Sequence, residues 1–180
     1  MQSNQGRVVS LIFTLTLAGA CAAVRADEAC LDFKWDVSVE RTLFASAPVP
    51  LAAGKDAKSA PIVVPNRLYS LKLAPQEQVA FRAAPGKAAS INPAYAGLVT
   101  LKIPAAGSYR VSVDRPFWID VVSNGGLLSP EDFQGQHACR APHKIVVFEL
   151  GATQPFILQL SNAAADSVLI SVTAAPRRKL

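Results

Sequence analysis

Alternating apolar and polar residues are the main pattern in the second half of the chain, and they predict β-strands. Tyr109, Val111 and Val113 are apolar, while the two residues between them are polar. A period of two places one set of side chains in a core and the other on the opposite face of a sheet. This pattern, or a short apolar run, predicts strands at 68–73, 79–82, 98–103, 109–113, 117–122, 145–150, 156–160 and 168–172.

The number and spacing of these strands predict the fold class. Eight or nine short strands separated by turns, with at most one short N-terminal helix, are typical of an all-β, jelly-roll-like β-sandwich. Alternation indicates sheets with one buried face and one wet face, which favours antiparallel pairing. The crossover helices that parallel strands require are missing from the pattern. We therefore expect one antiparallel β-sandwich domain over residues 27–175.

The helix is expected at residues 36–44. Asp36 is a suitable N-cap, and Val39, Leu43 and Phe44 share one face at helical spacing. The first four residues also alternate as a strand would, so the segment allows both interpretations. Stretches rich in Pro, Gly and polar residues predict loops, and these are residues 46–61, 84–93 and 129–143.

The first 26 residues have the three parts of an export signal. Arg7 precedes an uncharged stretch over 8–24, and a short cleavage pattern ends at Ala26. This predicts cleavage after Ala26, a mature chain that begins at Asp27, and a periplasmic or secreted location. Two alternatives remain open. The apolar run of about 17 residues is near the lower limit for a membrane anchor, and Cys21 is a candidate for lipid attachment.

Removal of this leader changes the charge of the chain. Without Arg7 and Arg25 the formal net charge falls by two, from +5 to +3. Three basic residues lie in a tail over 176–180, which we expect to be flexible, so the body is close to neutral. We therefore expect no nucleic-acid partner and no stable membrane insertion after cleavage. We also expect a monomer.

Two cysteines remain in the mature chain, Cys30 and Cys139. An even number in an oxidising compartment predicts a disulfide. It would close a loop of more than 100 residues, which contributes on the order of 4–5 kcal/mol in the chain-entropy model. The spacing excludes a zinc ribbon and a thioredoxin-like pair. We expect Phe33, Trp35 and Phe133 to cluster beside the bond.

The strand at residues 105–113 resembles a motif of a known group of domains. Its pattern, Ala-Gly-x-Tyr-x-Val-x-Val, is similar to that of bacterial pre-peptidase C-terminal domains and related jelly-roll modules. Residues 30–36 and 132–145 do not belong to that pattern and resemble small exported bacterial proteins of unknown function. These resemblances imply the compartment and the fold, and no activity. The segments similar to the group's closing strands are 148–150, 156–161 and 168–172.

The predicted loop at 129–143, with Lys144 after it, carries most of the candidate chemistry. His137, His143 and one carboxylate would form the ligand set of a non-haem iron enzyme, so a small metal-dependent enzyme is the alternative function. Their six-residue spacing matches no standard metal motif. A triad of Ser129, Asp132 and His137 would be unusual within so short a segment. The chain lacks Gly-x-Ser-x-Gly and a phosphate-binding loop. We therefore expect no enzyme activity and no cofactor.

Binding of a small molecule, a carbohydrate or a protein is the function that we expect. If Phe117, Ile119 and Val121 face the core, Trp118 is partly exposed and can act as an aromatic platform. The interpretation that we favour places Trp118 in the core and Phe117 at the strand edge. The candidate ligand-binding residues are Trp118, Asp120, Asp132, His137 and His143.

Overall fold

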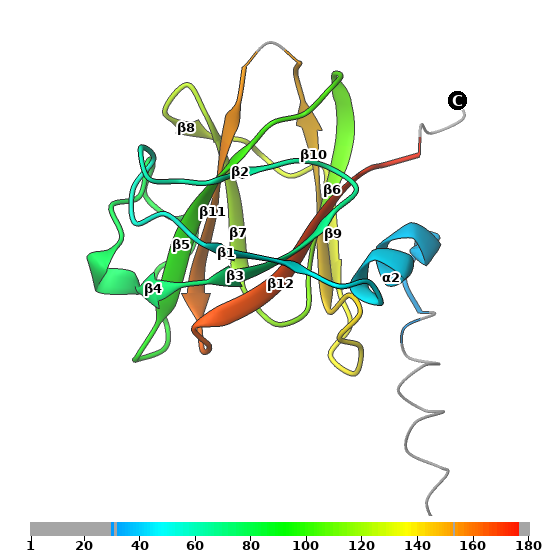
Figure 1. Cartoon of the computed structure of the whole chain (residues 1–180), viewed down its shortest axis with the longest axis horizontal. Helices are drawn as coiled ribbons and strands as arrows, with labels where there is room; N and C mark the ends of the chain where they lie inside the picture. Colours follow the sequence, from blue (N-terminus) through cyan, green and yellow to red (C-terminus); the bar gives the residue numbers. More distant parts are fainter. Residues whose placement is uncertain (1–29, 31, 153, 177–180) are drawn as a thin grey trace, which may run out of the picture.

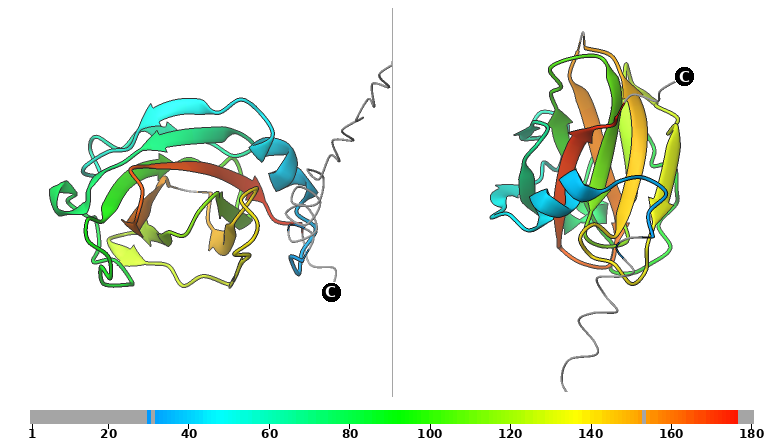
Figure 2. Two further views of the ribbon diagram at one scale, coloured as in Figure 1. Left: turned by 90° about the horizontal axis from the view of Figure 1, so that it is seen from below. Right: turned by 90° about the vertical axis from the view of Figure 1, so that its right-hand side faces the viewer.

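The computed structural model describes Cys30, residues 32–152 and residues 154–176, and shows two β-sheets packed face to face (Figures 1 and 2). The predicted leader with Cys21, and tail residues 177–180, lie outside the described residues. The expected all-β sandwich with one short helix is confirmed. Within the described part of the chain, no helix combines the length and apolar character needed to span a membrane.

The first sheet has the strand order β1-β3-β12-β6-β10-β9. Its central strands form because apolar residues alternate along them, and Tyr109, Val111 and Val113 of β6 are all buried. In the antiparallel register, Val111 lies opposite Val146 on one side and Val172 on the other. The strands are β1 (Val49–Ala52), β3 (Leu68–Lys72), β6 (Gly107–Val113), β9 (Asp132–Gly135), β10 (Lys144–Leu150) and β12 (Ser167–Ala174).

The second sheet has the strand order β2-β5-β11-β7-β8, and β4 also pairs with β5. Leu158 and Leu160 of its central strand β11 are fully buried, and they belong to the same core cluster as Val111 of the first sheet. One apolar core therefore joins the two sheets. The strands are β2 (Ile62–Val63), β4 (Ala74–Pro75), β5 (Tyr95–Leu101), β7 (Trp118–Ser123), β8 (Gly126–Leu127) and β11 (Phe156–Ala163).

Three segments differ from the predicted strands and loops. Residues 79–82 are not a strand: after the 3-10 turn η1 (Gln76–Gln78) the chain is irregular, and Val79 packs with Ala96 and Leu98 of the second sheet. The large apolar residues of 79–82 alternate with the others because one side of this irregular segment packs on the second sheet. The predicted loops at 46–61 and 129–143 contain β1 and β9, whose Pro and polar residues are compatible with edge strands.

The expectation of antiparallel pairing is wrong at two sheet edges. β1 pairs with β3 and β2 pairs with β5 in the parallel direction. The chain passes from β1 in the first sheet to β2 in the second and back to β3, so β1 and β3 can run the same way. β2 has two residues, and all four residues of β1 are apolar, so neither sequence shows alternation. Together with the short strands β4, β8 and β9, they raise the strand number to twelve among the described residues, above the eight or nine expected.

The helix is present as α2 (Ser38–Phe44), but its buried face differs from the prediction. Val39 is 56% exposed, whereas Glu40 is only 1% exposed. Asp36 accepts a hydrogen bond from the backbone N–H of Ser38 at 2.9 Å, although the residue at the N-cap is Val37. The helix packs beside β12 on the polar outer face of the first sheet (Figure 2), so it buries a charged residue there.

The predicted disulfide between Cys30 and Cys139 is confirmed. Phe33 and Val37 pack beside it as buried residues, and Trp35 contacts the same cluster. Phe133 does not belong to this cluster, contrary to our expectation. Neighbouring residues of a strand point to opposite faces, and Phe133 lies on the face of β9 that is turned away from the N-terminal segment.

Candidate functional site

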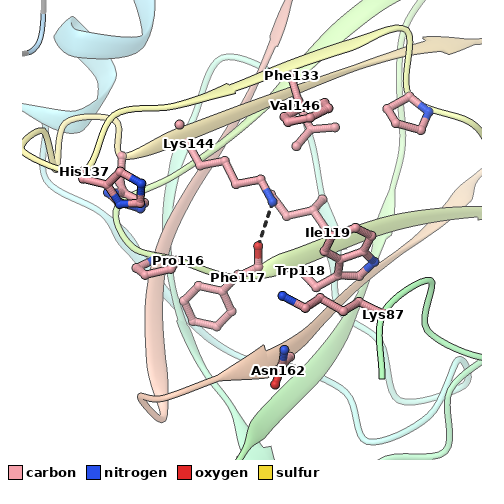
Figure 3. A pocket seen from close by; sticks show the side chains of 13 residues that line it. Lys87, Pro116, Phe117, Trp118, Ile119, Phe133, His137, Lys144, Val146 and Asn162 are labelled. Atoms are coloured by element: carbon pink, nitrogen blue, oxygen red, sulfur yellow. Dashed lines mark hydrogen bonds between the residues drawn. The ribbon is translucent and has the colours of Figure 1, made fainter. Parts of the chain in front are cut away.

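A cleft of about 390 Å³ opens between the two sheets at the edge formed by β9, β10 and the start of β7 (Figure 3). Phe133 of β9 lies opposite Val146 of β10, which belongs to the core, so both side chains share the inner face of the first sheet. On the other side, β8 covers only Val122 and Ser123 of β7. Phe133 lines the cleft and is 65% exposed.

Apolar side chains form most of the cleft wall. Phe117, directly before β7, and Ile119, within it, line the cleft and also belong to the core of the sandwich, as does Val146. Trp118 points to the opposite face of β7, yet its indole reaches the cleft around the strand edge (Figure 3). The cleft is therefore continuous with the core and open to solvent.

Trp118 is held in place from the outer face of the second sheet. Its indole Nε1–H donates to Oδ1 of Asp120 at 2.9 Å, and the backbone N–H of Gly86 donates to Oδ2 at 3.0 Å. A side chain at position 86 would place its Cβ only 2.9 Å from Asp120 Oδ1 and 3.1 Å from Trp118 Nε1. Glycine is required for this close approach. The contact fixes the loop residue that follows, Lys87, beside the indole.

Two lysines approach the indole of Trp118 from different segments. Lys144 begins β10, and its Nζ lies 5.3 Å from the ring centroid and donates to the carbonyl oxygen of Phe117 at 2.9 Å. Lys87 places its Nζ 5.9 Å from the same ring. Burial, followed by the nearby charge of Lys87, lowers the pKa of Lys144 below its ordinary value, while Asp120 acts in the opposite direction.

His137 and His143 form the other end of the cleft. Their ring centroids are 5.8 Å apart in an edge-to-face arrangement. Nδ1 of His143 lies 3.1 Å from the carbonyl oxygen of Cys139, and because a carbonyl only accepts, Nδ1 carries the proton. Burial lowers the pKa of His143 below its ordinary value, against the effect of this hydrogen bond. His143 is therefore mostly neutral at neutral pH.

The structure brings together some of the predicted binding residues. Trp118, His137 and His143 line the cleft. Asp120 is buried behind it and holds the indole, so it presents no free carboxylate to a ligand. Asp132 lies outside the cleft, on the outer face of β9, where Lys34 binds it at 2.5 Å.

The interpretation that we favoured for the strand at 117–122 is wrong. Phe117, Ile119 and Val121 face the core, and Trp118 is partly exposed at the cleft. Both faces of this strand are largely covered, since an irregular segment lies over the outer one. Solvent exposure therefore does not distinguish the two faces in the way that simple alternation assumes.

Sequence reasoning gave no binding role to Phe133, Lys87 or Lys144, although Lys144 was named beside the candidate loop. Phe133 was assigned to the disulfide cluster because the strand β9 was not recognised. Lys144 comes directly before an apolar run, and this position alone is a weak signal that its amino group lines a cleft. Lys87 lies in a Pro- and Ala-rich loop, and nothing in its local sequence indicates a site.

The metal-dependent alternative gains a pair of histidines but no complete ligand set. His137 and His143 come together as that hypothesis requires. Among the described residues, no three His, Cys, Asp or Glu side chains are grouped so that they could hold a metal ion. Cys139, between the two histidines, is bound in the disulfide.

Comparison with known proteins adds no family to this geometry. No protein-family model matches the chain, and no curated protein matches it. The resemblance to pre-peptidase C-terminal domains therefore stays a prediction.

Proposed function

We propose that this protein is a non-enzymatic binding module that acts outside the cytoplasm, and that the cleft beside β7, β9 and β10 is its ligand site. Phe133 carries this proposal. It shares the inner face of the first sheet with the core residue Val146, yet it is 65% exposed because it lines the open cleft. An exposed apolar wall that continues a core is the arrangement in which a ligand replaces missing core contacts.

The size and composition of the cleft support a small ligand. Its volume of about 390 Å³ falls within the range of roughly 300–1,000 Å³ that is typical of small-molecule sites. Aromatic and aliphatic side chains provide the wall, and a few lysine and histidine nitrogens lie among them. Such a site favours a small molecule with a ring or an apolar chain over a large carbohydrate or protein surface.

The disulfide supports a location outside the reducing cytoplasm. Bonds of this kind persist in the periplasm and in secreted proteins. The predicted leader at 1–26 would provide the route of export, and cleavage after Ala26 would leave Cys30 close to the new N-terminus. Lipid attachment at Cys21 is the alternative form of the same exported protein.

A neutral fluorescent probe tests the proposed site directly. The purified protein is titrated with N-phenyl-1-naphthylamine, whose emission rises in an apolar site. We expect saturable binding that Phe133→Ala weakens by about tenfold, which equals about 1.4 kcal/mol. The matched control is Ile62→Ala, because Ile62 is 61% exposed but lies on β2, away from the cleft.

The control variant makes the result specific. Ile62→Ala should bind the probe within twofold of the wild-type protein. Equal weakening by Phe133→Ala and Ile62→Ala would indicate adhesion to exposed apolar surface in general, and the proposed site would then be wrong. A failure to observe saturable binding would contradict it as well.

A further inference from the structure

We propose that the cleft binds a small molecule with an anionic head group, held between Lys87 and Lys144 beside Trp118, and with an apolar body that lies along Phe117 and Phe133. This inference rests on the proposed function and adds the chemical class of the ligand. Figure 3 shows the amino groups of Lys87 and Lys144 directed toward the same part of the cleft, from opposite sides.

The two lysines have no acidic partner of their own. Among the described residues, no Asp or Glu oxygen lies within ion-pair distance of Lys87 or Lys144. The two positive charges are close enough to disfavour each other, since Lys87 contributes to the lowered pKa of Lys144. Two like charges beside an apolar wall are unfavourable in the free protein, and an anion between them would relieve the repulsion.

Asp120 is the nearest candidate for a neutralising carboxylate, but its oxygens are already engaged. Oδ1 accepts from the Trp118 indole and Oδ2 accepts from the backbone of Gly86. Both bonds come from neutral donors, and the second one holds the residue that directly precedes Lys87. Asp120 therefore positions the cationic site without occupying it, and its distance from the two amino groups exceeds that of an ion pair.

The hydrogen-bonding capacity of Lys144 also leaves room for a ligand. An ammonium group has three donors, and the structure assigns one of them to the carbonyl oxygen of Phe117. The same bond holds the amino group at the mouth of the cleft instead of in bulk solvent. A carboxylate, sulfonate or phosphate ester can accept the remaining donors, and charge-assisted hydrogen bonds of this type are about twice as strong as neutral ones.

The body of the ligand is defined by the wall that leads away from the lysines. Phe117, Phe133 and Val146 are apolar, and Trp118 offers an aromatic face. Planar rings and short aliphatic chains fit such a wall. The chemical class is therefore an amphiphilic small anion, such as an aryl carboxylate or an aryl phosphate.

Three naphthalene compounds that share the same ring system but differ in head group test whether binding requires a negative charge. Isothermal titration calorimetry of the purified protein compares 2-naphthyl phosphate, 2-naphthoate and neutral 2-naphthylmethanol. We expect the phosphate to bind more tightly than the carboxylate, and the carboxylate about tenfold more tightly than the alcohol. Added salt should weaken the two anions and leave the alcohol unchanged.

Lysine variants locate the head group. Lys87→Met and Lys144→Met keep most of the side-chain volume and remove the charge, and each should weaken 2-naphthoate about tenfold while the alcohol stays within twofold. The control is Lys102→Met, because Lys102 is exposed and does not line the cleft. Lys87 is also exposed, so Lys87→Met tests the charge without disturbing the core even if Lys144→Met lowers stability.

The outcomes separate this inference from the function on which it rests. If the alcohol binds as tightly as the two anions, and Phe133→Ala weakens all three, the cleft is a binding site but the anionic head group is wrong. If Lys102→Met weakens the anions as much as Lys87→Met, the effect is general charge and the inference is also wrong. If none of the three compounds binds, both proposals fail.

Discussion

The outer faces of the two sheets are covered in different ways. Cys30 and residues 32–46, which we call the N-terminal cover, lie against the outside of the first sheet. The right-hand view of Figure 2 shows this segment crossing the strands of that sheet. Residues 79–93, the loop cover, lie against the outside of the second sheet. The N-terminal cover is attached by a covalent bond and a buried ion pair, whereas the loop cover is attached mainly by hydrogen bonds and a small apolar cluster.

The ion pair of the N-terminal cover lies beneath α2. Glu40 accepts hydrogen bonds from Arg110 at 3.3 Å and from the hydroxyl of Thr173 at 2.5 Å. Arg110 also donates to the backbone carbonyl of Asp36 at 2.8 Å, and its guanidinium lies 5.4 Å from the ring of Trp35. The charges are removed from water, so each depends on the other.

The loop cover is attached by the side-chain amides of β11. The carbonyl oxygen of Gln159 accepts from the backbone N–H groups of Arg82 and Ala83 at 2.7 and 3.1 Å, and its NH₂ donates to the carbonyl of Ala83. Asn162 accepts from the backbone of Ser90 at 2.9 Å in a similar way. These bonds satisfy backbone groups that would otherwise have no partner in an irregular segment.

The two covers therefore differ in how strongly they are attached and in how close they lie to the cleft. The loop cover carries Lys87 and borders the cleft, so the cover with the weaker attachment lies beside the proposed ligand site. Segments held by few bonds open at a lower free energy than the rest of a domain. The predictions below test whether the two covers are unequal in this way.

Removal of the disulfide should have the largest effect. We expect the double variant Cys30→Ala/Cys139→Ala to lose about 4 kcal/mol of unfolding free energy, because the unfolded chain regains the entropy of a loop that spans 109 positions. Denaturant unfolding measures the loss. Hydrogen exchange should show the N-terminal cover opening before the strands and before the loop cover. Alkylation of both cysteines in untreated wild-type protein would contradict the pairing.

Loss of the buried charge should have the next largest effect. Glu40→Gln leaves Arg110 without its counter-charge, and we expect a loss of about 3 kcal/mol in unfolding free energy. The matched control is Glu77→Gln, because Glu77 is exposed in η1, and it should change stability by less than about 0.5 kcal/mol. Similar losses in both variants would mean that the ion pair does not hold the cover.

Detachment of the loop cover should cost less. Gln159 is fully buried, and Gln159→Leu introduces an apolar side chain of similar size and removes three hydrogen bonds. We expect a loss of about 2 kcal/mol, since backbone groups lose their partners. Hydrogen exchange should rise across 79–93 and stay unchanged in the N-terminal cover. The exposed Gln154→Leu is the control, and equal exchange in both variants would remove the distinction between the covers.

The smallest expected effect is that of low pH on the unfolding free energy, acting through His143. His143 lies in the segment that the disulfide holds, and burial keeps its pKa below the ordinary value of 6.5. The unfolded chain therefore binds a proton at this site more readily than the folded chain. The contribution of His143 to stability is complete above about pH 6.5 and declines as the pH falls. His143→Gln should reduce the loss of unfolding free energy between about pH 7.5 and pH 5.5, and an unchanged loss would contradict this assignment.

The central strands could be predicted from the sequence, because β6, β7, β10, β11 and β12 carry their own pattern. The disulfide followed from the number of cysteines. The covers could not be predicted, because polar residues at outward positions, such as Asp120 and Gln159, suggest contact with water. Their burial depends on residues more than 30 positions away, including Gly86 and Arg82. The cleft could not be predicted for a similar reason, because Lys87 and Lys144 lie far apart in the sequence and belong to no common motif.

The lengths of the edge strands also affect how separate copies of the protein behave toward each other. β2 and β8, at the two ends of the second sheet, have two residues each. β1 has four residues and includes Pro50, which has no backbone donor. On β9, the side chain of Gln134 bonds the N-terminal cover, and Asp132 binds Lys34. Within the described part of the chain, a folded copy therefore offers a partly unfolded copy no long strand edge on which to aggregate.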